Sequence, residues 1–167
     1  MADIAKYGIA LFAVFIVIGW WISRDKSALI MGAALLVPVT AVIAYLTQQF
    51  IDNGFNESRP YAIYPDILVL VSKTTDPSFP SDHACAAGAI AAGLFFVNRR
   101  LAWVATASAI VLAFSRVYSG AHWPLDVVVG LLFGAAIAVV SILILRTPLA
   151  WLVTKLRDSP VRWFLQK

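Results

Sequence analysis

The sequence predicts an all-α integral membrane protein: a bundle of about five transmembrane helices followed by an amphipathic C-terminal helix at the membrane interface. Of the 167 residues, 61% are hydrophobic and only 13% are charged, and the mean hydropathy is +0.84. Soluble globular domains carry about 25% charged and roughly 45–50% apolar residues. One small core cannot bury this apolar excess, so much of it must face lipid. The composition excludes a disordered chain, a secreted disulfide scaffold and a soluble nucleic-acid-binding protein.

Five apolar stretches predict the transmembrane helices, because crossing a bilayer takes about 20 mostly apolar residues. In chain order they are residues 4–22, 28–51, 82–97, 101–118 and 125–145. The apolar part of the third stretch is short, and we expect it to reach the headgroup region through Asp82 and His83. Its many alanines and glycines, together with Gly130 and Gly134 in the fifth stretch, predict close helix packing within the chain.

The last twenty residues form an amphipathic segment in which tryptophans and leucines mix with basic residues. Such segments lie along a membrane surface, with their tryptophans at headgroup level. We therefore expect a transmembrane domain over residues 1–147 and an interfacial tail over residues 148–167.

The basic residues predict the orientation, because Lys and Arg are enriched on the cytoplasmic side of membranes. One side of the predicted bundle carries nine of them, namely Arg24, Lys26, Arg99, Arg100, Arg146, Lys155, Arg157, Arg162 and Lys167. The other side carries Lys6, Arg59, Lys73 and Arg116. We therefore expect a cytoplasmic C-terminus. The opposite end, which holds both histidines and most acidic residues, is expected to face outward.

Three groups of polar residues lie at these outward helix ends. In chain order they are Arg59-Pro60, then Pro80-Ser81-Asp82-His83, and then Ser115-Arg116 with His122 and Asp126. Their spacing matches no zinc or two-metal site, so we predict no metal. Ionisable residues at membrane depth are costly and usually functional.

The residue types favour the binding of a phosphate. Ser81 precedes an apolar helix, and a helix N-terminus offers free N–H groups to an anion. Arg59 and Arg116 add planar guanidinium groups that match phosphate oxygens. Taken singly, Arg59 could instead anchor to lipid headgroups, and Ser81 could be only a helix cap.

The two histidines predict chemistry on that phosphate. Asp126 lies four residues after His122, a spacing that lets its carboxylate hold one ring nitrogen and leave the other exposed. His122 would attack phosphorus and form a phosphohistidine that water hydrolyses, while His83 supplies the proton to the leaving group. Asp126 alone could merely favour the helix dipole, but the whole set is hard to explain without catalysis.

This ordered set resembles the motifs of the type 2 phosphatidic acid phosphatases, K-x6-RP, PSGH and SR-x5-H-x3-D. The matched stretch runs from Arg59 to Asp126, and the third motif is the most specific. The resemblance implies a metal-independent lipid phosphatase without a cofactor, in which His122 is the nucleophile, Asp126 orients it and His83 is the acid. It also implies a phosphate cradle made of Arg59, Ser81 and Arg116.

The chain departs from those motifs at two positions. Asp52 stands where the first motif has lysine, and Lys73, in the outer loop, could reach the phosphate instead. Asp82 replaces the glycine of the second motif. The stretch S-F-P-S-D-H-A over residues 78–84 resembles the bacterial undecaprenyl-diphosphatases of the bacitracin-resistance type.

That branch implies hydrolysis of the terminal phosphate of undecaprenyl (polyprenyl) diphosphate at the extracytoplasmic face of a bacterial inner membrane, which would recycle the lipid carrier for cell-wall synthesis. Alternative substrates are phosphatidylglycerophosphate, phosphatidate and a prenyl-phosphosugar phosphate. An alternative of another class is a non-enzymatic transporter or assembly subunit, which would spread polar residues through the middle of the bundle. The expected partners are a lipid phosphate and the bilayer, with no nucleic acid, and the sequence leaves the oligomeric state open.

Overall fold

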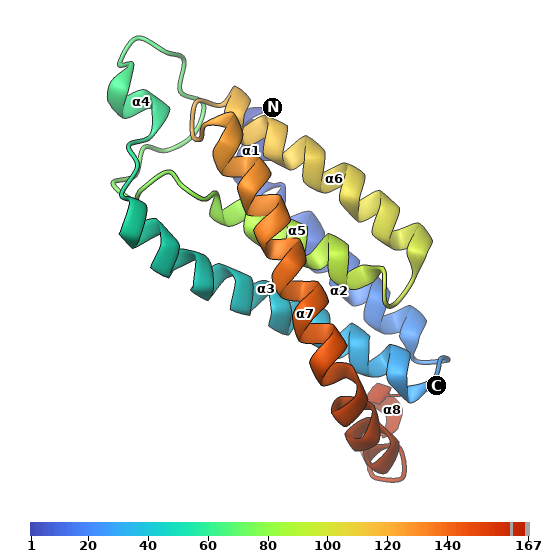
Figure 1. Cartoon of the computed structure of the whole chain (residues 1–167). Coiled ribbons are helices and arrows are strands. Elements are labelled where there is room, and N and C mark those ends of the chain that lie inside the picture. The colour runs from blue at the N-terminus through green and yellow to red at the C-terminus, as the bar shows by residue number, and fades with distance from the viewer. Residues whose placement is uncertain (161, 166–167) are drawn as a thin grey trace.

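The computed structural model of this chain describes residues 1–160 and 162–165. The described residues form helices α1 (Ala2–Tyr7), α2 (Ile9–Ser23), α3 (Ala28–Phe55), α4 (Pro60–Ile63), α5 (Asp82–Leu94), α6 (Arg99–Tyr118), α7 (Pro124–Leu156) and α8 (Arg162–Leu165). Figure 1 shows the long helices side by side in one bundle. The predicted all-α fold of a membrane protein is confirmed.

Among the described residues, three helices are long and apolar enough to cross a membrane: α3 over Ala28–Asp52, α6, and α7. Helix α2 is apolar but shorter. It continues the direction of α1 because Gly8, between them, keeps right-handed helical dihedrals (φ −58°, ψ −27°) and donates to the carbonyl of Ile4 at 2.8 Å. The predicted first span therefore corresponds to α1 and α2 together.

Local chemistry explains where the long helices begin. The side chain of Ser27 accepts the backbone N–H of Ile30 at the start of α3, and Asn98 accepts that of Leu101 at the start of α6. Pro124 occupies the first turn of α7, where its missing N–H costs no hydrogen bond. These are ordinary N-terminal caps, and they can be read directly from the sequence.

Helix α5 is the central element of the bundle. Its 13 residues span about 20 Å at 1.5 Å per residue, which is less than the ~30 Å of a bilayer core. It packs against α2, α3, α6 and α7, and most of its residues are buried, the majority of these being alanines and glycines. The helix ends at Leu94, three residues before the end of the predicted third span, and places Asp82 and His83 at its start.

Glycines allow α5 and α7 to touch backbone to backbone. A Cβ at Gly88 of α5 would overlap the carbonyl oxygen of Leu131, and one at Gly134 of α7 would overlap that of Cys85. A Cβ at Gly130 would lie 2.8 Å from the carbonyl oxygen of Ser81. The small-residue pattern thus serves packing within the chain, as predicted.

The C-terminal part differs from the expected separate tail. Helix α7 does not end near residue 145 but continues through Pro148 to Leu156. Helix α3 supports this extension, because a Cβ at Gly32 would lie only 3.2 Å from the carbonyl oxygen of Arg146. The short helix α8 then folds back, so that Leu165 joins a buried cluster with Val153 and Met31. Of the predicted tail, residues 161, 166 and 167 lie outside the described residues.

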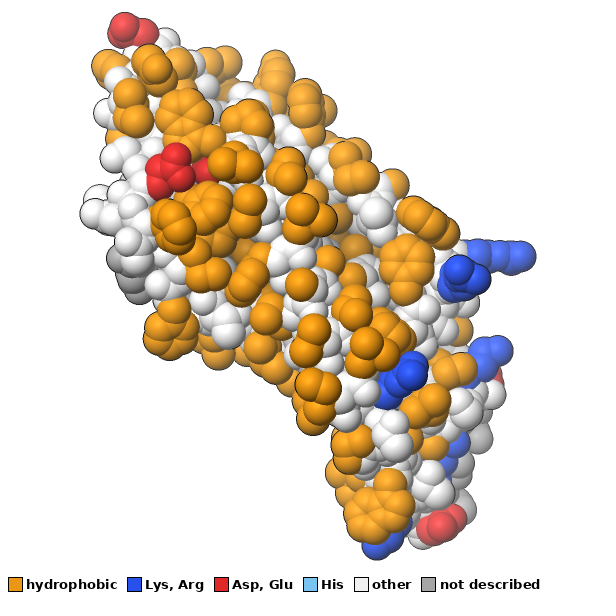
Figure 2. Space-filling view, in the orientation of Figure 1, with side chains coloured by type: hydrophobic (Ala, Val, Ile, Leu, Met, Phe, Trp, Pro, Cys, Tyr) orange, Lys and Arg blue, Asp and Glu red, His pale blue; other side chains and the backbone are white. Residues whose placement is uncertain are grey.

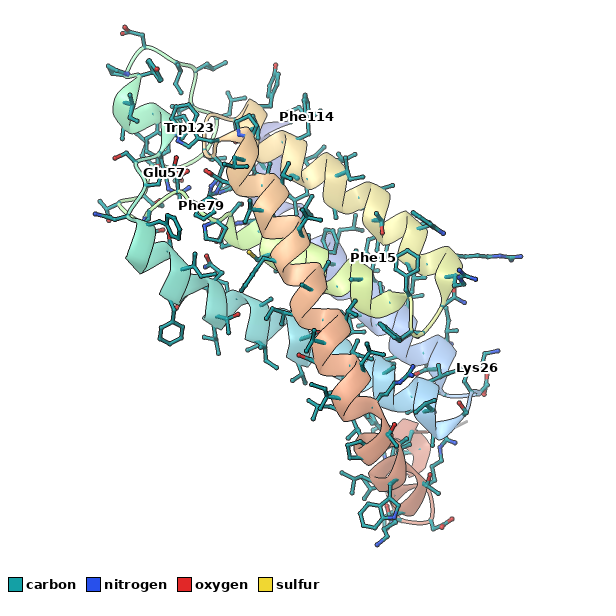
Figure 3. The ribbon with its side chains drawn as sticks, viewed as in Figure 1. Phe15, Lys26, Glu57, Phe79, Phe114 and Trp123 are labelled. Atoms are coloured by element: carbon teal, nitrogen blue, oxygen red, sulfur yellow. The ribbon has the colours of Figure 1, made fainter. Side chains whose placement is uncertain are left out.

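The surface agrees with a lipid environment. Figure 2 shows hydrophobic side chains covering the visible flank of the bundle, and Lys and Arg gathered toward the end that carries the C-terminus. Figure 3 shows Glu57, Phe79 and Trp123 at the opposite end and Lys26 at the basic end. The predicted site and most of the basic residues therefore lie at opposite ends of the molecule.

Candidate active site

The polar groups predicted from the sequence meet at the end of the bundle that holds the N-terminus and the start of α5 and α7 (Figures 1 and 3). The turn between α6 and α7 carries His122. Gly120 makes this turn possible, because its φ of +72° lies in the left-handed region and the carbonyl oxygen of Leu68 would be only 3.2 Å from a Cβ there. The turn brings His122 against the loop that precedes α5.

His122 is buried, with 2% of its surface exposed, and both ring nitrogens are in contact with polar groups. Its Nδ1 lies 2.8 Å from the carbonyl oxygen of Ser78. A carbonyl only accepts, so Nδ1 carries the hydrogen and Nε2 carries a lone pair. Nε2 lies 3.2 Å from Nη1 of Arg59 and 3.3 Å from Nη2 of Arg116. The nitrogen that carries the lone pair therefore points between two guanidinium groups.

Asp126 supports His122 in a different way from the one predicted. Its Oδ2 lies 3.6 Å from Nδ1 of His122, which is too long for a hydrogen bond. The same oxygen accepts the hydroxyl of Ser78 at 2.5 Å and the backbone N–H of Trp123 at 2.8 Å. Asp126 thus holds Ser78 and the turn, and the carbonyl of Ser78 holds the imidazole. Ser78 was missed as a site residue, although it lies within the S-F-P-S-D-H-A stretch.

The pKa of His122 is lowered from its usual 6.5. Burial is the largest cause, since it disfavours the charged imidazolium, and the positive charges of Arg59 and Arg116 act in the same direction. Asp126 opposes them. At neutral pH the ring is therefore neutral, which is the form in which Nε2 can act as a nucleophile.

Backbone carbonyls orient the two arginines. Arg59 donates through Nε to the carbonyl of Asp76 at 3.0 Å and through Nη1 to the carbonyl of Ala121 at 3.2 Å. Arg116 donates through Nη1 to the carbonyl of Ala5 at 2.9 Å. Both guanidinium groups are thus held beside Nε2 of His122, and the two positive charges together favour the binding of an anion there.

The start of α5 supplies Ser81, Asp82 and His83. The Ser81 N–H donates to the carbonyl of Asp126 at 3.1 Å, but its buried hydroxyl makes no capping bond and finds no partner among the described residues. Asp82 Oδ1 lies 2.8 Å from Nδ1 of His83 and 4.0 Å from Nε2 of His122. The structure thus brings together both histidines, both arginines, Ser81 and Asp126, all of which the sequence predicts as site residues.

Two cavities open onto this cluster, and Arg59, Asp76 and Asp82 line both. The larger, about 450 Å³, is also lined by Tyr45, Gln48, Gln49, Asp52, Pro77, Pro80 and His122. The smaller, about 230 Å³, is also lined by Lys6, Val71, Ser72, Thr74, His83 and Arg116. The loop between α4 and α5 therefore walls the site.

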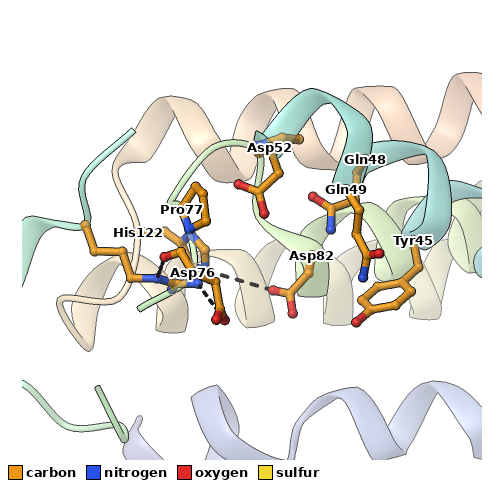
Figure 4. Close-up of a pocket in the computed structure, with 10 residues that line it drawn as sticks. Tyr45, Gln48, Gln49, Asp52, Asp76, Pro77, Asp82 and His122 are labelled. Carbon is orange, nitrogen blue, oxygen red and sulfur yellow. Dashed lines mark hydrogen bonds and ion pairs between the residues drawn. The ribbon is translucent and has the colours of Figure 1, made fainter. Parts of the chain in front are cut away.

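Helix α3 contributes a polar face that, apart from Asp52, the sequence motifs did not indicate. Tyr45, Gln48, Gln49 and Asp52 follow helical spacing, and Figure 4 shows them on one side of α3, facing the larger cavity. Four polar residues in this order, near the end of an apolar span, could have been found from the sequence.

Among the described residues, Lys73, the lysine expected to reach the phosphate, does not line either cavity, whereas Lys6 of α1 lines the smaller one. The Lys73 ammonium lies 5.7 Å from the ring centroid of Tyr61 instead. The hydroxyl of that tyrosine accepts the backbone N–H of Thr74 at 3.0 Å, so the loop carries Lys73 alongside α4. Within the described ranges, no three His, Cys, Asp or Glu side chains are placed to hold a metal ion.

Comparison with known proteins gives several relatives. The chain is 28% identical over 127 residues to an undecaprenyl-diphosphatase (BcrC) of Bacillus subtilis, covering 76% of this chain and 64% of that protein. It is 30% identical over 132 residues to an undecaprenyl-diphosphatase of Sulfolobus acidocaldarius, with the same coverage. A lipid A 1-phosphatase of Rhizobium johnstonii is 48% identical over 60 residues, which are 35% of this chain and 24% of that protein.

The alignments with the undecaprenyl-diphosphatases span just under two thirds of the length of those relatives. No solved structure matches the chain significantly. The family assignment comes from residues 33–149, which match the PAP2 superfamily and include α5, α6, the start of α7 and every predicted site residue. The chain therefore belongs to the PAP2 superfamily.

Proposed function

We propose that this protein is a membrane-embedded lipid phosphatase that transfers the terminal phosphate of its substrate to His122. The observation that carries this proposal is the lone pair on Nε2 of His122, held 3.2 and 3.3 Å from the guanidinium nitrogens of Arg59 and Arg116. A phosphate bound between Nε2 and the two guanidinium groups would have its oxygens on the arginines and its phosphorus next to Nε2. Ionisable groups gathered at one end of the bundle, rather than along its middle, favour an enzyme over a transporter.

The reaction follows in two steps. Nε2 of His122 attacks phosphorus, and the bond from phosphorus to the leaving oxygen breaks as His83 donates a proton to that oxygen. Water then attacks the phosphohistidine, His83 takes a proton from this water, and inorganic phosphate leaves with His122 restored. Arg59, Arg116 and the unpaired Ser81 hydroxyl stabilise the charge on the equatorial oxygens in both steps. No step uses a metal or a cofactor.

The proposed substrate is undecaprenyl diphosphate or another polyprenyl diphosphate. Relatives named undecaprenyl-diphosphatase, matched over about three quarters of this chain, support it. A second candidate is a phosphorylated lipid whose leaving group is a sugar or glycerol. The lipid A 1-phosphatase relative, at 48% identity over 60 residues, and the polar face of α3, with its two glutamines, favour this alternative.

We also propose that the site faces the outside of a bacterial inner membrane, with the C-terminus in the cytoplasm. The basic residues near the C-terminal end support this orientation (Figure 2). A reporter fused to the C-terminus and active only in the cytoplasm is the expected result. Activity of the same fusion outside the cell membrane contradicts the orientation.

Phosphate release by the purified protein in detergent with excess EDTA tests the function. Undecaprenyl diphosphate, phosphatidate, phosphatidylglycerophosphate and lipid A are compared, with His122→Ala as the inactive control. Release that survives EDTA and disappears in His122→Ala is expected, and the fastest lipid identifies the substrate. Activity that persists in His122→Ala, or that EDTA abolishes and Mg²⁺ restores, rules out the proposed chemistry.

A further inference from the structure

Asp82 lies between the two histidines of the site. Its Oδ1 accepts the backbone N–H of His83 at 2.7 Å and lies 2.8 Å from Nδ1 of the same residue. It also lies 4.0 Å from Nε2 of His122 (Figure 4). The carboxylate is therefore bound to His83 twice and borders the place where phosphate would react.

The Nδ1 atoms of the two imidazoles have different partners. His122 presents its Nδ1 to a neutral carbonyl, that of Ser78, whereas His83 presents its Nδ1 to a carboxylate. A carboxylate fixes the hydrogen on Nδ1 and stabilises the imidazolium that forms when the other nitrogen takes a proton. A neutral carbonyl fixes the tautomer without favouring protonation. This difference suits a nucleophile at His122 and a proton carrier at His83.

A purely structural explanation accounts for only part of this arrangement. Asp82 is the first residue of α5, where an acidic side chain favours the helix dipole, and its bond to the His83 N–H belongs to that role. The contact with Nδ1 of His83 satisfies no backbone group and so does not stabilise the helix end. The side chain of His83 is 23% exposed and lines the smaller cavity, so the ring can reach a ligand there.

We infer that Asp82 is a positioning residue for His83 and that its main effect is on hydrolysis of the phosphohistidine. The inference rests on the proposed function. When the leaving group is a lipid monophosphate, the leaving oxygen is weakly basic and needs little help from an acid. Water is a poor nucleophile at neutral pH, so the second step depends on a base. In that step Nε2 of His83 takes the proton of the attacking water, the oxygen forms its bond to phosphorus, and the bond from phosphorus to Nε2 of His122 breaks.

The test separates the two steps with undecaprenyl diphosphate labelled with ³²P in its terminal phosphate. In Asp82→Asn, which keeps an oxygen at this position but removes the charge, we expect a burst of about one undecaprenyl phosphate per protein, followed by slow turnover. Phosphate release falls on the order of 10²-fold, and label accumulates on the protein. His83→Gln is expected to behave alike, and the double variant no worse than His83→Gln alone, because the two residues act as one unit.

Asp76→Asn is the matched control, since Asp76 lines both cavities and its carboxylate faces Arg59 at 3.9 Å rather than a histidine. We expect it to change binding without accumulating labelled protein. Equal slowing of both steps in Asp82→Asn, or additive losses in the double variant, overturns the inference while leaving the proposed function intact. Turnover by His122→Ala, in contrast, overturns the proposed function itself.

A second readout uses the pH dependence of the same variants. The other charged groups facing Asp82 and His83 in the smaller cavity are Lys6, Arg59, Asp76 and Arg116, and Asp82→Asn leaves all of them in place. Loss of the carboxylate leaves Nδ1 of His83 without its partner and the ring out of position, so raising the pH should not restore wild-type phosphate release. Full recovery at high pH would contradict positioning by Asp82. Asp82→Gly removes the carboxylate and its hydrogen bonds together, and should accumulate at least as much label.

Discussion

Replacing Gly134 by alanine should separate the two helices that carry the candidate active site. The new Cβ would overlap the carbonyl oxygen of Cys85 in α5 and lie 2.8 Å from its carbonyl carbon and 3.0 Å from the amide nitrogen of Ala89. Ordinary contacts of this kind are 3.4–4 Å, and all three obstacles are backbone atoms that no side-chain rotation can move. The helices must therefore move apart by about 1 Å.

The structure predicts the size of both consequences. Overpacking of this kind costs about 1–3 kcal/mol, which in a chain of this length lowers Tm by roughly 3–10 °C. Gly134 lies on α7 two turns beyond Asp126, and α5 carries Ser81 and His83. The Ser81–Asp126 backbone bond of 3.1 Å joins the two helices at the site. Since a displacement of about 1 Å can cost on the order of 10²-fold in rate, kcat should fall by that order.

Gly54→Ala is the matched control, because nothing lies within 4 Å of a Cβ at Gly54 in α3. Its Tm should be unchanged or slightly raised, since alanine favours a helix. The assay is thermal unfolding of the detergent-solubilised protein together with phosphate release at 25 °C. If Gly134→Ala keeps both the wild-type Tm and the wild-type kcat, the reasoning from backbone contact at the α5–α7 crossing is refuted.

Four further predictions concern the site. The pKa of His122 lies below its usual 6.5, and protonation removes the lone pair of Nε2. We therefore expect kcat/KM to stay level near pH 7 and to fall toward acid with a midpoint below pH 6.5, and a midpoint above that value contradicts the burial argument. Arg116→Lys, assayed at saturating lipid, should lower kcat on the order of 10²-fold, because lysine cannot contact both the Ala5 carbonyl and His122; near-normal kcat would show that a point charge suffices. Lys6→Ala should raise KM for the lipid while Lys73→Ala should not, and the reverse order would restore the role first expected for Lys73. Ser78→Ala should lower kcat about tenfold, since Asp126 loses the hydroxyl that holds the loop, and an unchanged kcat would place the support of His122 elsewhere.

The transmembrane helices could be predicted from the sequence because hydrophobicity and helix caps are local properties. Ser27, Asn98 and Pro124 begin helices where the sequence suggests. The end of α7 could not be predicted in this way. Proline usually interrupts a helix, but at Pro148 the neighbouring α3 packs against the backbone on both sides of it, and this contact involves residues more than 100 positions apart.

The order and type of the polar residues were enough to predict which side chains lie together at one end of the bundle, including His122, His83, Arg59 and Arg116. Their hydrogen-bond partners were not predictable. The sequence pairs His122 with Asp126, while the structure places the carbonyl of Ser78 on the ring and turns Asp126 toward the Ser78 hydroxyl.

By itself, then, the sequence determined the class of the protein, the start of its long helices and the set of polar residues at one end of the bundle, since each depends on residue type and near spacing. Only the tertiary structure decided that Lys6 rather than Lys73 lines the smaller cavity and that Asp82 lies between the two histidines. The physical reason is that backbone carbonyls and distant side chains reach the site only through the path of the loops and the close α5–α7 contact. Neither the path of the loops nor the α5–α7 contact can be predicted from local composition.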